Sequence, residues 1–142
     1  MSQTLILLPV FGQVFLTFLV LILLGIARQA SLAAKGRSIE DIALSGDDVW
    51  DEHALKRSNN FKNQFELPVL FYAVCAFALI TRMVDIAFLC LAFGFFFSRI
   101  VQTYVHLTFN RVSIRGGAYI IGFVCLVAMW VILAVRITMA GF

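Results

Sequence analysis

Four long runs of apolar residues alternate with polar links along this chain of 142 residues. The runs cover about residues 5–27, 61–80, 86–109 and 118–135. Their lengths are close to the roughly 20 residues that an α-helix needs to cross the hydrocarbon core of a bilayer. The pattern therefore predicts an all-α integral membrane protein, a four-helix bundle that forms a single four-span domain over residues 1–142.

The first run has one competing interpretation, a cleaved signal peptide. A signal peptide carries Lys or Arg before a shorter apolar core. Here no Lys or Arg precedes the run, which is also too long for such a core. We therefore expect residues 5–27 to remain as a membrane span, with Pro9 near its start, where a helix tolerates proline best.

Composition agrees with a membrane protein and excludes several other classes. Hydrophobic residues make up 62% of the chain, charged residues 13%, and the mean hydropathy is +0.97. The net charge of +3 gives no support for a nucleic-acid partner. Cys75, Cys90 and Cys125 lie inside apolar runs without the close spacing of a zinc site or a disulfide framework. We expect them to be buried, inert thiols.

The only sizeable polar segment, residues 28–58, is predicted to be a solvent loop with a short helix around residues 38–44. Its acidic cluster DDVWDE matches no known cation loop and is expected to be a solvated face. Lys and Arg concentrate in this loop and in the third link, residues 110–116. The positive-inside rule therefore predicts that both links are cytoplasmic and that both termini lie outside.

Polar residues also occur within the second and third apolar runs, where they are costly to desolvate. On continuous helices they form two stripes, each on one face. The stripes consist of Asn59, Asn63 and Glu66 in the second run, and of Arg99, Gln102, His106 and Asn110 in the third. A carboxylate and a guanidinium at membrane depth are expected to be paired, functional, or both.

Counting residues in both directions from the turn at Met83 places the two stripes at matching depths. Antiparallel neighbours rise equally per residue. The predicted layers are Glu66 with Arg99, Asn63 with Gln102, and Asn59 with His106. Two interpretations stay open: a structural ion pair with hydrogen-bonded amides, or a polar pocket that opens to the cytoplasm and binds an anionic ligand.

His106 could also be a haem ligand. Haem sites within helical bundles generally use a pair of axial ligands, whereas the only other histidine, His53, lies in the predicted loop. We therefore expect neither haem nor another metal.

At these positions the sequence resembles the MAPEG family, the membrane-associated proteins in eicosanoid and glutathione metabolism. Four short spans, a long first cytoplasmic loop, and the N-x-x-E motif of Asn63 and Glu66 followed closely by Pro68 carry the resemblance. The segment RIVQTYVHL, which begins at Arg99, and the segment RVSIR, which ends at Arg115, are similar to the microsomal prostaglandin E synthase branch without a gap.

The resemblance implies a homotrimer that binds glutathione, as a thiol co-substrate, between neighbouring subunits near the cytoplasmic face. Asn63 and Glu66 match the family's glutathione-binding asparagine and glutamate, and Arg99 matches an arginine near the ligand. Arg115 matches the arginine thought to hold the thiolate, and it is the expected catalytic residue. The lipophilic substrate would reach the site from the lipid.

Several positions depart from the family pattern. Asn59 and Lys62 stand at positions where some members carry arginine, and Gln102 and His106 stand where members carry His or Tyr, and Tyr. Gly116 replaces a serine. These departures are typical of a divergent, bacterial-type branch and favour a bacterial inner membrane. The expected glutathione-binding set is Asn59, Lys62, Asn63, Glu66, Arg99, Gln102 and His106.

We therefore expect a glutathione-dependent membrane transferase or peroxidase that acts on lipophilic electrophiles. One alternative is a non-catalytic member of the same fold that binds lipids or acts as a scaffold. A second is a small multidrug transporter, but that class normally carries its membrane glutamate in the first span. Here the first run has no charged residue before Arg28.

Overall fold

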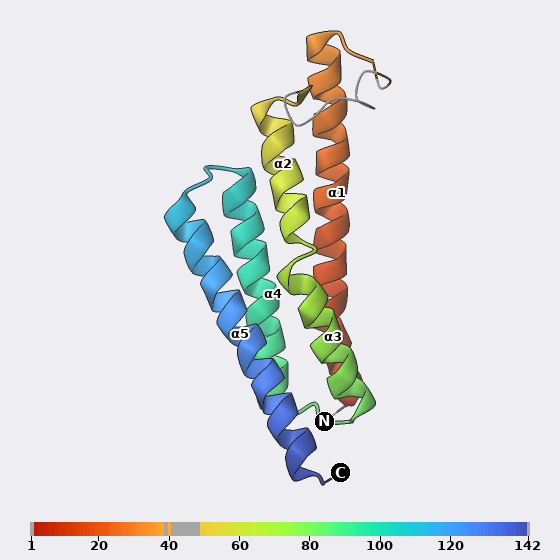
Figure 1. Cartoon of the computed structure of the whole chain (residues 1–142), viewed down its shortest axis with the longest axis vertical. Helices are drawn as coiled ribbons and strands as arrows, with labels where there is room; N and C mark the ends of the chain where they lie inside the picture. The colour runs from red at the N-terminus through yellow and green to blue at the C-terminus, as the bar shows by residue number, and fades with distance from the viewer. Residues whose placement is uncertain (1, 39, 41–48, 142) are drawn as a thin grey trace.

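The computed structural model describes residues 2–38, 40 and 49–141, and all regular secondary structure in them is helical (Figure 1). The helices are η1 (Gln3–Ile6), α1 (Leu7–Lys35), α2 (Glu52–Asn63), α3 (Leu67–Ile80), α4 (Ile86–Leu107) and α5 (Val112–Met139). Four stretches, with η1 joined to α1 and α2 to α3, are long and apolar enough to cross a membrane. The predicted all-α four-span bundle is confirmed. The short helix predicted around residues 38–44 lies largely outside the described residues.

The helices extend beyond the apolar runs, so the predicted limits of the polar links are wrong. The first helix continues to Lys35 and ends at Gly36, whose φ of 60° is the left-handed conformation that suits glycine. The helix α2 already begins at Glu52, where Asp51 accepts a hydrogen bond from the Ala54 N–H at 2.8 Å. A helix satisfies its own backbone in water as well as in lipid, so the apolar run marks the membrane, not the helix end.

The second span is broken, although the sequence pattern predicted one continuous helix. The helix α2 ends at Asn63 and α3 begins at Leu67, with Glu66 at φ −91° and ψ −98° between them. Pro68 lies in the first turn of α3, where its missing N–H has no helical partner to lose. The chain changes direction at this break (Figure 1).

The helices pack as an α4–α5 hairpin against α1 and against the two halves of the broken span. The helix α2 packs on α1 and α4, whereas α3 packs on α5. In the half of the bundle that contains both termini, the core is apolar: Phe71 stacks on Phe95 with ring centroids 4.4 Å apart. Gly122 allows close approach of α4 and α5, because a Cβ there would lie 2.4 Å from Ser98 Oγ.

The three cysteines are free thiols with different surroundings. Cys75 is buried and Cys125 is half-buried, but Cys90 is exposed on the outer surface of the bundle. The expectation of three buried thiols is therefore wrong for Cys90 and is met only in part by Cys125. An apolar run in a membrane helix has a lipid-facing side as well as a core-facing side, and hydropathy alone does not separate them.

Candidate functional site

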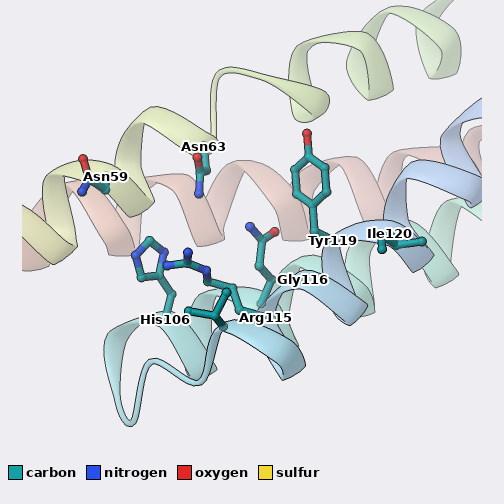
Figure 2. Close-up of a pocket in the computed structure, with 9 residues that line it drawn as sticks. Asn59, Asn63, His106, Arg115, Gly116, Tyr119 and Ile120 are labelled. Carbon is teal, nitrogen blue, oxygen red and sulfur yellow. The ribbon is translucent and has the colours of Figure 1, made fainter.

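A cavity of about 510 Å³ lies between α2 and the α4–α5 hairpin, at the end of the bundle where α4 and α5 are joined (Figure 2). Side chains from three helices meet there. Its lining consists of Asn59 and Asn63 from α2, Gln102 and His106 from α4, and Val112, Arg115, Gly116, Tyr119 and Ile120 from α5. The structure thus brings together, from three helices, five of the eight residues that were expected to bind glutathione or to act in catalysis.

The break in the second span accounts for the position of this cavity. On one side of the break α3 packs on α5 and α1, and on the other side α2 packs on α1 and α4. The axes of α2 and α3 therefore point in different directions (Figure 1). The helix α2 contacts the hairpin through α4. The face of α5 around Arg115 and Tyr119 is therefore left open to the cavity.

The electrostatics of the cavity favour an anion. Arg115 lies in it half-buried, and its Nη1 donates to Asn110 Oδ1 at 3.0 Å. Asn110 has a φ of 45° in the tight link between α4 and α5. Arg115 belongs to the first turns of α5, which starts earlier than predicted, so it lies near the positive end of the helix dipole. The described residues that line the cavity include no carboxylate.

Gln102 gives the cavity an acceptor as well as donors. Its side chain is only 3% exposed, and its Oε1 has no hydrogen-bond partner among the described residues. Enclosed polar atoms are nearly always partnered, and an exception calls for an explanation such as a ligand. A ligand that occupies this cavity can therefore present an anionic group to Arg115, and a small shift of the Gln102 side chain would let its Oε1 accept from an N–H group of the ligand.

Arg99 is buried behind the cavity, at 1% exposure. Its Nη2 donates to the backbone carbonyl of Asn63 at 2.7 Å, while Nε and Nη1 have no partner among the described residues. Its guanidinium also lies 6.0 Å from the centre of the Tyr119 ring, which lines the cavity.

The predicted ion pair between Glu66 and Arg99 is wrong. Glu66 is exposed, and the structure records no salt bridge between the two described residues. The broken helix explains the change of partner. Asn63 is the last residue of α2, so its carbonyl has no intrahelical donor and is free to accept from Arg99.

The other two predicted layers have the right depth in the bundle, but only one of them has the right residue on the inward face of α2. Asn63 and Gln102 both line the cavity. His106, however, bonds to Asn60 rather than Asn59, with Asn60 Nδ2 lying 3.2 Å from His106 Nδ1. Asn59 is exposed at the mouth of the cavity. Asn59 and Asn60 are adjacent identical residues, and a helix turns by about 100° between them.

Three expected binding residues do not line the cavity of the single chain. Lys62 and Glu66 are exposed on the second span and do not line it. Arg99 does not line it either, although its contacts with Asn63 and Tyr119 support the wall.

A buried set of polar residues lies behind the cavity and was not predicted from the sequence. Gln13 Nε2 donates to Gln64 Oε1 at 2.8 Å, and Gln64 Nε2 donates to Asn60 Oδ1 and to Thr103 Oγ1, each at 3.2 Å. All four side chains are at most 5% exposed. The signal was present in the sequence, since Gln13 is an amide within the first apolar run and Asn60 and Gln64 are four residues apart on one face.

Four apolar stretches long enough to cross a membrane, with an open cavity lined by polar residues of three helices, define a multi-pass helical membrane protein. The family model of the MAPEG family matches residues 6–135, nearly the whole chain, and the protein belongs to this family. Neither the curated proteins nor the solved structures gave a match to the chain.

Proposed function

We propose that the protein is a glutathione-dependent membrane transferase or peroxidase that acts on lipophilic electrophiles. The observation that carries the proposal is the composition of the cavity. One site of about 510 Å³ combines the fixed cation Arg115, the unpartnered acceptor of Gln102, and the polar side chains of Asn59, Asn63 and His106. This combination suits a small peptide that carries carboxylates, N–H groups and a thiol.

Arg115 supplies the chemistry that a thiol transferase needs. A free thiol has a pKa of about 8.5, so only a minor fraction is thiolate at neutral pH. A cation beside the sulfur stabilises the thiolate and lowers that pKa, and arginine stays protonated at any working pH. The thiolate then forms a bond to the electrophilic carbon, and the leaving group departs with the bonding electrons.

The walls of the cavity suit one reactant that enters from the lipid and another that enters from the water. Val112 and Ile120 line it while being 67% and 61% exposed, so an apolar edge continues to the outer surface of the bundle. A lipophilic electrophile can enter from the membrane along that edge. Glutathione enters from the water at the joined end of α4 and α5, which we place in the cytoplasm of a bacterial cell because Lys and Arg concentrate there.

We extend the proposal to the family's homotrimer. Lys62 and Glu66 are exposed at the break in the second span and do not reach the cavity of their own chain. In a trimer, these two side chains can contact glutathione bound in the cavity of a neighbouring subunit.

The test compares Arg115→Ala and Arg115→Lys with Arg111→Ala, which removes an exposed arginine that does not line the cavity. Wild-type trimer should gain thermal stability from millimolar glutathione by mass action. Arg115→Ala should stay folded and bind glutathione, but its bound thiol should titrate at a higher pKa. Conjugation of a model aryl halide should fall roughly a hundredfold, as for loss of one preorganised charge-stabilising group.

Arg111→Ala should retain the wild-type titration and rate. If an intact wild-type trimer shows no thermal shift and no conjugation, the protein is the lipid-binding or scaffold member of the family instead. If Arg115→Ala keeps the wild-type thiolate titration, the assignment of Arg115 is wrong even when glutathione binds.

A further inference from the structure

The polar residues behind the cavity form a directional chain of hydrogen bonds that ends on His106. Gln13 on α1 donates to Gln64, Gln64 donates to Asn60, and the Asn60 amide nitrogen faces His106 Nδ1. The chain crosses from α1 through the end of the broken span to α4. In both Gln64 and Asn60 the amide oxygen faces the Gln13 end of the chain and the amide nitrogen faces His106. All donors therefore point in the same direction.

This direction decides which nitrogen of His106 carries the proton. Gln64 Nε2 donates to Asn60 Oδ1, which leaves Asn60 Nδ2 as the group that faces the ring. An amide nitrogen is a donor only, so His106 Nδ1 must accept. A neutral histidine that accepts at one nitrogen carries its hydrogen on the other, here Nε2.

His106 Nε2 is available to a ligand. The ring lines the cavity, and Nε2 has no hydrogen-bond partner among the described residues. Figure 2 shows His106 and Arg115 on the α4–α5 side of the cavity, with Asn59 and Asn63 on α2. A donor fixed at this position adds to the cation of Arg115 in binding one anionic group.

We propose that Gln13, Gln64 and Asn60 act as positioning residues that hold His106 in the Nε2–H tautomer, so that its ring donates a hydrogen bond to an anionic group of glutathione. This inference rests on the proposed function for the identity of the ligand. The tautomer itself is a property of the protein without ligand, and it can be measured separately.

The experiment uses the full chain in lipid nanodiscs with ¹⁵N-labelled histidine side chains. The chain contains two histidines, so His106→Gln assigns the signals of His106 by difference from His53. Nitrogen chemical shifts distinguish a protonated ring nitrogen from an unprotonated one. Wild-type His106 should show a protonated Nε2 and an unprotonated Nδ1.

Two variants act on the chain at different distances from the ring. Asn60→Asp replaces the donor with a carboxylate, which accepts only, so the proton should move to Nδ1. Gln13→Met removes the first donor without adding a charge near the cavity, and His106 should become a mixture of tautomers. Gln3→Met is the matched control, because Gln3 bonds only to the backbone of Val84 at the opposite end of the bundle.

The affinity for glutathione should follow the tautomer. If only a fraction of the protein is competent to bind, the apparent Kd rises by the inverse of that fraction, about twofold for an equal mixture. Gln13→Met should therefore raise the Kd by the inverse of its Nε2–H fraction, while Gln3→Met should leave the tautomer and the Kd unchanged. A purely structural role for Gln13 predicts lower stability with no change of tautomer.

The outcomes separate the two proposals. A wild-type His106 protonated at Nδ1, or a tautomer that is unchanged in both folded variants, overturns the inference whether or not glutathione binds. If Asn60→Asp does not fold, Gln13→Met alone decides. An Nε2–H tautomer in a protein that binds no glutathione leaves the hydrogen-bond chain standing and overturns the proposed function.

Discussion

The two ends of the bundle are built from the same four spans, but they are held together by different interactions. In the half with the termini, the enclosed side chains are apolar, as in the stack of Phe71 on Phe95. In the half with the cavity, amides, His106 and the guanidinium of Arg99 are equally enclosed. Shape complementarity specifies the first half, and directional hydrogen bonds specify the second.

The difference lies in what each half leaves unsatisfied. Apolar side chains have no polar atoms that need a hydrogen-bond partner, and truncating one of them costs only van der Waals contacts. Among the described residues, the enclosed atoms without partners in the polar half include Nε and Nη1 of Arg99 and the side-chain oxygens of Gln102 and Gln13. Such atoms are tolerated where a ligand or a neighbouring subunit can supply the missing partner, so the apolar half holds the fold and the polar half is the part that we propose to bind.

The largest expected effect comes from breaking the apolar half. Phe95→Ala should remove the stacked contact with Phe71 and leave a void, lowering the free energy of unfolding by about 3 kcal/mol. Phe97→Ala on the same helix is the control, because Phe97 is 57% exposed on the outer surface. Unfolding in mixed micelles measures both, and equal losses for the two variants would show that the stack does not organise this half.

A smaller effect concerns the ionic contact that closes the same end. Arg136 donates to Asp85, and this contact, aided by the Phe88 N–H, holds the pKa of Asp85 below its ordinary value of 3.8. A carboxylate with a lowered native pKa contributes its stabilisation fully above the unfolded pKa and loses it as the pH falls through the native value. Because Asp85 is exposed, the contribution is at most about 1 kcal/mol.

The melting temperature of the wild type should therefore fall between about pH 5 and pH 3. Asp85→Asn, which keeps a good helix cap, should reduce this fall, and Arg136→Gln should reduce it to a similar degree. A slope that neither variant changes would assign the acid sensitivity to other carboxylates.

The smallest expected effect is a weak coupling between the described residues Glu66 and Arg99, because Glu66 forms no salt bridge with Arg99 but still acts on its charge from a distance. Since the structure records no salt bridge between these described residues, Glu66→Gln and Arg99→Met should be additive within about 0.5 kcal/mol. Thermal unfolding of the two single variants and the double variant measures the coupling. A larger coupling would mean that the carboxylate does reach the guanidinium, and that the polar half contains a true ion pair.

The spans were predictable from hydropathy because a bilayer imposes a minimum apolar length. The depth of the polar layers followed from the same regular rise, as Asn63 and Gln102 show by lining one cavity. The face was not predictable, because the sequence carries Asn59 and Asn60 side by side, and only packing against α1 and α4 shows that Asn60 points inward.

The break in the second span had a partial signal in Pro68. A proline explains why a helix starts near it, but it does not fix how the preceding residues end the previous helix. The assignment of Glu66 to a buried pair failed for this reason: its place on a continuous helix was an assumption about three residues, Gln64 to Glu66. By contrast, Gln13 could have been noticed as an amide within an apolar run.

The broken second span also affects how the protein enters the membrane during synthesis. The helix α3 has 14 residues, so it rises only about 21 Å, less than the roughly 30 Å of hydrocarbon that it must cross. The remainder of the crossing is the polar α2, whose inward amides are satisfied only by α1 and α4. The inward amides of this segment find their partners on α4 only after the third span has been synthesised, so we expect the second span to reach its final packing after that point.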